Sequence, residues 1–266
     1  MSAPTSSTRT LSLAGKNIFV AGASRGIGAA LAKALAAQGA FVLVGYGSRK
    51  EAALEVVEAI KAETPGAKAD VVGGDLASAS GAQAIAKDIL SKTGGSIDTL
   101  VLTSGYLGNV AIHNLNQEEW DKHISTNVTG PVFLVQALLP HIRTEGRIIF
   151  FSSSLVVNPM SITPNYLSYL AAKGAIEQTV RVLARDPAIT GAERRITVNC
   201  VAPGPVKTEL FLEGKPEELV KKIASLTPRN TIAETEDIVG TILFLASPLS
   251  QWVVGQTLRV NGGMTC

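Results

Sequence analysis

The alternation of short apolar runs with segments of helical periodicity is the feature that most constrains the fold. Strand-like runs lie at 17–22, 41–46, 69–76, 98–105, 147–153, 195–204 and 256–263. Helix-like segments lie between them, at about 26–38, 49–63, 80–92, 117–142 and 166–185. Because the runs are almost wholly apolar, each strand should be buried on both faces. We therefore expect an α/β protein with one doubly wound, seven-stranded parallel sheet and helices on both faces.

No linker, repeat or low-complexity segment divides the chain, which predicts one domain over residues 13–266 after a disordered tail at 1–12. The longest interruption, about 205–233, is rich in Thr, Glu, Pro and Lys. Ligands of such folds bind at the carboxyl ends of the strands. A loop of this length at that edge would suit a lid over a substrate.

Composition excludes several classes of partner. A net charge of +2, without basic clusters that include aromatic residues, gives no strong electrostatic attraction to nucleic acid or anionic membranes. The two cysteines cannot form a disulfide framework, and the three histidines have no metal-like spacing, so we expect no metal. No apolar run reaches transmembrane length, and the polar start does not resemble a signal peptide. We expect a cytoplasmic protein that acts on a small molecule.

A glycine-rich turn follows the first predicted strand and opens the first predicted helix. In "VAGASRGIG", Gly22, Gly26 and Gly28 would allow a tight turn and a close backbone approach to a pyrophosphate. The free N–H groups and the dipole of the helix N-terminus favour such an anion. The alternative is a glycine-rich turn without a ligand. The position between strand and helix favours a dinucleotide.

The residues after the second strand indicate which dinucleotide. An acidic residue there would bind the ribose of NAD, but this chain has Tyr46, Ser48, Arg49 and Lys50 nearby and no carboxylate. Arg25 lies within the glycine-rich turn. Arginines with a serine suit a 2′-phosphate, so we expect NADP(H) rather than NAD(H). The alternative is that Arg49 and Lys50 only begin the solvated face of a helix.

A phenol and an ammonium share one helix face, because "YLAAK" places Tyr169 and Lys173 at i and i+4. The cation should lower the pKa of Tyr169 from its usual value near 10 toward working pH, which would make it a general acid or base. Tyr166 lacks this partner, since Leu170 stands four residues after it. A chance Tyr–Lys pair is the alternative.

Other polar residues could complete a site. Ser152, Ser153 and Ser154 close an apolar strand, where one hydroxyl could donate to a substrate oxygen; they could equally cap loop backbone. Asn127 lies in the predicted helix at 117–142. It could be a satisfied core amide, or it could order a water beside Lys173.

Several motifs agree in order and spacing with one family. They are "AGASRGIG", "GDL", "NVTGP", "GRIIFFSSS", "YLAAK", "VNCVAPGPVKT" and "VGQTLRVNGG". Over about residues 13–263 the chain resembles the short-chain dehydrogenase/reductase family, which implies a Rossmann fold. The "LTSG" after the fourth strand, Leu102 to Gly105, replaces the family's usual N-N-A-G. It is similar to fungal NADPH-dependent polyketide and naphthol reductases, and the chain also resembles 3-oxoacyl carrier-protein reductases.

The resemblance implies a role for each candidate. Tyr169 is expected to be the catalytic acid or base, and Lys173 to lower its pKa and hold the nicotinamide ribose. Asn127 would anchor a proton-relay water, and alignment of "GRIIFFSSS" selects Ser153. The spacing from Ser153 to Tyr169 exceeds the family's usual one, whereas Tyr166 fits it. We retain Tyr169 because of Lys173, and we interpret 155–165 as an enlarged loop over the substrate.

The cofactor set is completed by the resemblance, with Asp75 at the adenine and Pro203, Gly204, Val206 and Thr208 around the nicotinamide. The expected NADP(H) contacts are Gly22, Ser24, Arg25, Gly26, Ile27, Gly28, Tyr46, Ser48, Arg49, Asp75, Leu76, Ser104, Gly105, Tyr169, Lys173, Pro203, Gly204, Val206 and Thr208.

The sequence therefore predicts NADP(H)-dependent reduction of a ketone, or the reverse reaction. The expected substrate contacts are apolar or phenolic, which favours a hydrophobic, aromatic or polyketide-like ketone: Tyr106, Leu155, Met160, Tyr166, Pro205, Leu210 and Phe211. Alternatives are a non-catalytic NADP(H) sensor or scaffold, and dehydration or epimerisation on the same fold. The resemblance also implies a homo-oligomer, either a tetramer or a dimer.

Overall fold

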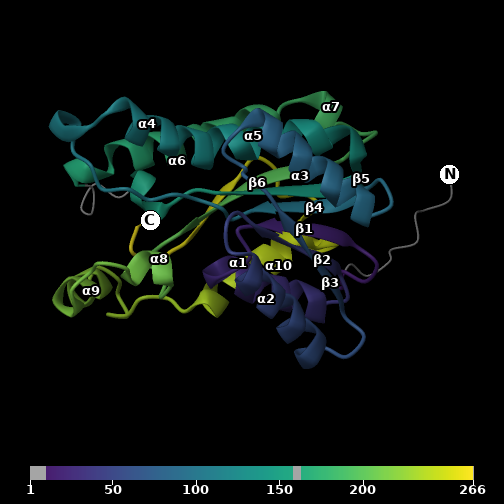
Figure 1. Ribbon diagram of the computed structural model, residues 1–266, viewed down its shortest axis with the longest axis horizontal. Helices are drawn as coiled ribbons and strands as arrows, with labels where there is room; N and C mark the ends of the chain where they lie inside the picture. The colour runs from purple at the N-terminus through teal and green to yellow at the C-terminus, as the bar shows by residue number, and fades with distance from the viewer. Residues whose placement is uncertain (1–9, 158–162, 266) are drawn as a thin grey trace.

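The computed structural model describes residues 10–157 and 163–265. A seven-stranded sheet runs through it in the order β3-β2-β1-β4-β5-β6-β7, and every neighbouring pair is parallel (Figure 1). This confirms the predicted sheet. The strands are β1 Asn17–Ala21, β2 Phe41–Tyr46, β3 Lys68–Gly73, β4 Ile97–Leu102, β5 Ile142–Phe151, β6 Thr197–Pro203 and β7 Thr257–Val260.

Helices cover both faces of the sheet, as the apolar strands require (Figure 1). One layer holds α1 Gly26–Ala37, α2 Lys50–Glu63 and α10 Thr235–Ala246. The other holds α3 Ala79–Lys92, α5 Gly130–Leu138 and α6 Leu167–Leu183, with α4 Gln117–Ile124 beside α6 and α7 Pro187–Thr190 after it. Strand order reverses between β1 and β4, so the loops after these two strands diverge and leave a crevice.

Two regions differ from the predicted helices. The single helix expected at 117–142 is divided, because a π-helical turn, Ser125–Thr129, separates α4 from α5. The interruption at 205–233 contains two short helices, α8 Glu209–Leu212 and α9 Glu217–Ala224, which lie at one end of the sheet (Figure 1, left). Helix α10 is not among the predicted helices. Within the described residues, no helix combines the length and the apolar character that crossing a membrane requires.

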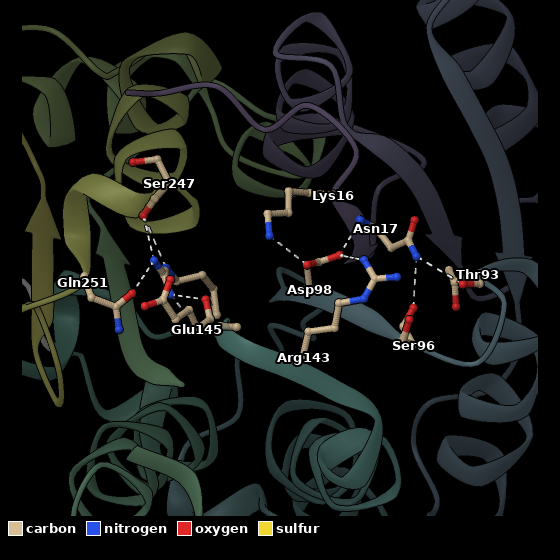
Figure 2. A network of polar contacts seen from close by, with 11 residues as sticks. Lys16, Asn17, Thr93, Ser96, Asp98, Arg143, Glu145, Ser247 and Gln251 are labelled. Carbon is tan, nitrogen blue, oxygen red and sulfur yellow. Dashed lines mark hydrogen bonds and ion pairs between the residues drawn. The ribbon is translucent and has the colours of Figure 1, made fainter. Parts of the chain in front are cut away.

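A polar network joins the amino ends of the central strands (Figure 2). The buried Asp98 carboxylate accepts hydrogen bonds from Lys16 Nζ at 3.0 Å, Asn17 N at 2.9 Å and Arg143 Nη1 at 2.9 Å. A second cluster surrounds the buried Arg147, whose guanidinium donates to Ser247 O and to Gln251 Oε1. These contacts hold β1, β4 and β5 together at the edge opposite the ligand-binding end.

We expect Asp98→Asn to lower the free energy of unfolding by about 1–3 kcal/mol, because the amide replaces an acceptor of three hydrogen bonds, two of them from cations. Urea titration would measure the change. Asp70→Asn is the matched control: Asp70 is half exposed, and its partners are Lys92 and the adjacent Val71 N–H, so its loss should cost less than about 1 kcal/mol. Equal losses in the two variants would contradict a bracing role for Asp98.

Candidate functional site

A cleft of about 440 Å³ opens at the carboxyl ends of β1 to β5. Its wall combines the glycine-rich turn, the segments after β2, β3 and β4, and the start of α8. The predicted cofactor residues on this wall are Gly22, Ser24, Arg25, Gly26, Ile27, Gly28, Tyr46, Ser48, Arg49, Asp75, Leu76, Ser104, Gly105 and Thr208. The structure therefore brings most of the predicted set to one place.

The glycine-rich turn has the geometry that a pyrophosphate needs. Gly22 and Gly26 have φ values of 71° and 56°, in the left-handed region that favours glycine. A Cβ on Gly22 would lie only 2.9 Å from Ser104 Cα, so a side chain would push the turn away from β4. Helix α1 begins here with no acidic residue in its first turn and, among the described residues, no side-chain cap. Its N–H groups are therefore available to an anion.

The segment Thr103 to Gly105 follows β4, where the family that the sequence resembles usually has the end of an N-N-A-G motif. Thr103 Oγ1 donates to Ala21 O at 2.5 Å and so joins the ends of β4 and β1. Ser104 Oγ is buried and has no hydrogen-bond partner within the described part of the chain. A buried hydroxyl in a cofactor-sized cleft without an acceptor fits a group that arrives with the ligand. The residues present therefore fit a dinucleotide.

Arg25 and Arg49 converge on a single carboxylate. Arg49 Nη2 and Nη1 donate to Glu209 Oε1 and Oε2 at 2.9 and 3.1 Å, and Arg25 Nη1 lies 2.6 Å from Glu209 Oε1. The hydrogen bond from Arg49, followed by the close ion pair with Arg25, lowers the pKa of Glu209, and the Glu209 hydrogen bond raises the pKa of Arg49. Sequence reasoning missed Glu209, since no local pattern joins residues 160 positions apart.

Ser153 and Tyr169 form the reactive pair. Ser153 follows β5, is buried, and shares a hydrogen bond with the Tyr169 hydroxyl. Lys173 is one turn further along α6; its Nζ donates to Phe151 O at 3.1 Å and lies 5.8 Å from the centre of the Tyr169 ring. Strand end and helix face thus bring the predicted hydroxyl, phenol and ammonium together.

The neighbouring serines have other partners. Ser152 Oγ donates to Glu177 Oε1 at 3.0 Å, and Ser154 Oγ donates to Ala202 O at 2.8 Å. Of the three, Ser153 is the one that shares a hydrogen bond with Tyr169; its role as the catalytic serine stays a prediction. Glu177, buried on α6, is a further residue that the sequence did not single out.

The pKa of Tyr169 does not behave as expected. Burial raises it to about 12, because phenolate loses hydration, while the hydrogen bond from Ser153 lowers it only in part. Burial also lowers the pKa of Lys173 to about 8. The predicted fall in the Tyr169 pKa is therefore wrong for the protein without ligands: desolvation exceeds the effect of a cation whose Nζ is directed at Phe151 O.

Asn127 connects the reactive pair to the cleft. Its Nδ2 donates to Tyr106 O and His123 O, each at 3.0 Å, and its Oδ1 accepts from Tyr106 N at 3.2 Å. This is the satisfied buried amide that the sequence left as one alternative. A Cβ on Gly105 would lie 3.1 Å from Asn127 Oδ1 and 3.4 Å from Lys173 Nζ. Gly105, which lines the cleft, therefore places both side chains beside it.

The remaining predicted residues are less closely associated with the cleft. Pro203 ends β6, Gly204 and Val206 follow the strand, and none of the three lines the cleft. Among the substrate candidates, Tyr106 and Leu210 line the cleft, and the Tyr166 ring centre lies 6.4 Å from that of Tyr169.

The other substrate candidates differ from one another. Pro205 lines a separate cavity of about 290 Å³, Leu155 and Phe211 are partly buried outside the main cleft, and Met160 lies outside the described residues. Tyr106 directs its hydroxyl to Glu119 Oε1 at 3.0 Å. The described residues contain no cluster of His, Cys, Asp and Glu that could hold a metal ion.

Known proteins share this sequence and architecture. A family model described as enoyl-(acyl carrier protein) reductase matches residues 22–265. A hydroxynaphthalene reductase-like protein, Arp2 of Metarhizium majus, is 36% identical over 264 residues, covering 95% of this chain and 96% of that protein.

Solved structures agree with this result. A dehydrogenase/reductase from Sinorhizobium meliloti has a TM-score of 0.87 and 30% identity, covering 96% of this chain and 97% of that one. The angucycline C-6 ketoreductase LanV, solved with bound NADP, has a TM-score of 0.86 and 33% identity, covering 95% and 96%. The chain belongs to the short-chain dehydrogenase/reductase family, and the protein is an oxidoreductase.

Proposed function

We propose that this enzyme reduces a hydrophobic or aromatic ketone to a secondary alcohol with NADPH, or catalyses the reverse reaction. The observation that carries the proposal is the hydrogen-bonded Ser153–Tyr169 pair, with Lys173 one helical turn away, beside a cleft that fits a dinucleotide. The relatives that are named as ketone or naphthol reductases support the same reaction.

The proposed chemistry assigns one task to each side chain. Bound nicotinamide would supply the hydride. Tyr169 donates its proton to the carbonyl oxygen, and the Ser153 hydroxyl hydrogen-bonds that oxygen as negative charge develops on it. Because its pKa is raised to about 12, Tyr169 is a protonated phenol at neutral pH, which is the form that reduction needs. Lys173, with Asn127 beside Gly105, would return a proton from solvent.

NADP(H) is the cofactor that the charges favour. Arg25 and Arg49 come from different turns yet meet one carboxylate, so an anion can contact both guanidiniums at this point. The end of β2 carries no carboxylate that could bind the ribose 2′-hydroxyl of NAD. The bound NADP of the LanV ketoreductase is consistent with this preference.

The segment at 205–233 would close over the substrate. Its helices α8 and α9 expose Leu210, Leu212 and Leu219 at the ligand end of the sheet. Leu210 already lines the cleft. Apolar side chains on a short segment at the mouth of a site suit a lid for an apolar ketone.

Tyr169→Phe should lower kcat for ketone reduction by about a hundredfold to ten-thousandfold, because the proton donor is lost, while NADPH binding stays within about twofold. Absorbance of NADPH during turnover and its fluorescence on binding would measure the two quantities. Tyr166→Phe removes a neighbouring phenol and serves as the matched control. Retained turnover in Tyr169→Phe, with loss in Tyr166→Phe, would assign the acid to Tyr166.

The ionisation of Tyr169 can be followed directly by the near-ultraviolet absorbance of phenolate. The difference between wild type and Tyr169→Phe should show no Tyr169 phenolate below about pH 10, because a group with its pKa at about 12 is protonated throughout that range. A difference signal that develops around neutral pH would contradict the raised pKa and would favour a phenolate base.

Cofactor preference tests the phosphate argument. Arg25→Ala and Arg49→Ala should each weaken NADPH binding by about tenfold, because each removes a charge-assisted contact to the 2′-phosphate. NADH binding should change by less than about twofold. Fluorescence titration of both cofactors would measure the effect. An unchanged ratio of NADPH to NADH affinity in both variants would defeat the assignment of NADP(H).

A further inference from the structure

The carboxylate of Glu209 occupies the point where Arg25 and Arg49 meet. It comes from α8 in the predicted lid, whereas the arginines come from the turns after β1 and β2. One carboxylate therefore bridges the cofactor half of the cleft to the lid. We call this set of three side chains the Glu209 clasp.

Within the clasp, Glu209 balances part of the positive charge of the two arginines but does not satisfy all of their hydrogen-bond donors. Arg25 Nη1 lies within 2.6 Å of Glu209 Oε1, yet it is shielded from solvent and lacks a hydrogen bond of good geometry within the described residues. The side chains of Arg25, Arg49 and Glu209 are 36%, 49% and 50% exposed. Ion pairs this exposed are screened by water and are readily exchanged. A phosphate offers three acceptor oxygens and more charge than one carboxylate.

The same contact fixes the position of α8. Thr208 Oγ1 caps the helix by accepting from Phe211 N at 3.2 Å, so residues 208–211 form one unit. Thr208 Cγ2 lies 3.3 Å from the point where a Cβ of Gly26 would stand, which places the helix start against the glycine-rich turn. Within the described structure, the pairs with Arg25 and Arg49 tie the side chains of 208–215 to the cofactor half of the cleft, while Thr208 Oγ1 donates locally to Val206 O at 3.4 Å.

The segment before α8 is anchored separately. Lys207 N donates to Ala233 O at 2.8 Å, Val206 pairs with Ala233, and Lys207 Nζ pairs with Glu234 at 3.1 Å. Release of Glu209 would therefore leave 206–207 in place and free the helix that carries Leu210 into the cleft.

We propose that Glu209 is a displaceable occupant of the 2′-phosphate site, so that a 2′-phosphorylated nucleotide takes over Arg25 and Arg49, expels the carboxylate and releases α8 from the cofactor cleft. A nucleotide without the 2′-phosphate leaves the clasp closed. This inference rests on the proposed NADP(H) preference and adds a specificity residue that couples the phosphate to the lid. The Glu209 carboxylate competes with the 2′-phosphate for the two arginines. Removal of its charge therefore tightens the binding of 2′-phosphorylated nucleotides and leaves the binding of other nucleotides unchanged.

The test uses 2′,5′-ADP and 5′-AMP, which share the adenosine but differ in the 2′-phosphate. By isothermal titration calorimetry, Glu209→Gln should bind 2′,5′-ADP about three- to tenfold more tightly than wild type. Its affinity for 5′-AMP should stay within about twofold. Glu213→Gln is the matched control, because it removes the same charge from the same segment, while Glu213 acts on Arg49 only through a Coulombic attraction weaker than that of Glu209; it should change both affinities by less than about twofold.

Limited trypsin digestion reports on α8 independently of affinity. Cleavage after Lys207, directly before the capping residue Thr208 of α8, should accelerate in wild type with 2′,5′-ADP and not with 5′-AMP. Glu209→Gln should be cleaved at the fast rate without either nucleotide. Cleavage that is unaffected by 2′,5′-ADP in wild type would overturn the release of α8.

The outcomes separate this inference from the proposed cofactor. If wild type prefers 2′,5′-ADP over 5′-AMP and Glu209→Gln does not tighten it, the clasp is overturned and the NADP(H) assignment stands. Weaker 5′-AMP binding in Glu209→Gln would make Glu209 a ligand of the ribose hydroxyl and would also overturn the clasp. Equal wild-type affinities for the two nucleotides would defeat the NADP(H) assignment and the clasp together.

Discussion

The close approach of the glycine-rich turn to the end of β4 is the constraint on which the ligand-binding end depends. A Cβ on Gly22 would lie 2.9 Å from Ser104 Cα, and one on Gly28 would lie 2.4 Å from Gly22 O. Without side chains at these positions, the start of α1 stands directly over the crevice where the strand order reverses. The same approach shields Ser104 Oγ from solvent and keeps Gly105 beside Asn127 and Lys173. One backbone contact thus sets both the anion site and the place of the reactive residues.

Buried polar groups are paired differently at the amino ends and at the carboxyl ends of the strands, which we call the amino edge and the carboxyl edge. At the amino edge, Asp98 is saturated by three donors and Arg147 by backbone and side-chain acceptors (Figure 2). At the carboxyl edge, inside the described structure, Ser104 Oγ is buried without a hydrogen-bond partner, and Arg25 Nη1 has an ion pair with Glu209 in place of a well-aligned hydrogen bond. Buried polar groups without partners lower stability. The amino edge stabilises the sheet, and the carboxyl edge keeps donors for a ligand, as expected where stability is given up for binding.

The sequence correctly predicts those structural features that depend on local patterns of residues. Apolar runs predict all seven strands, and the i, i+4 spacing places Tyr169 beside Lys173 on α6, because helix geometry needs only neighbours in the chain. The division of the helix at 117–142 could not be foreseen, since it accompanies the contacts of Asn127 with Tyr106 and His123 backbone. Desolvation of Tyr169 depends on atoms from distant segments, so the direction of its pKa shift was predicted wrongly. Glu209 reaches Arg49 across 160 positions, beyond any spacing rule.

The long-range features are also those that join the two halves of the cleft. We propose that Arg25 and Arg49 bind the adenosine end and that Tyr169 and Ser153 act at the other end; no single strand or helix among the described residues holds all four. Two segments span the distance: 103–106, through Ser104, Gly105 and the Asn127 contacts, and α8, through Glu209 and Leu210. The first is rigid, because it is pinned to β1 and to a buried amide. Among the described residues, the second is tied to the arginines by exposed ion pairs, so under the proposed clasp it is the segment that would respond to what the arginines bind and carry that change to the substrate end.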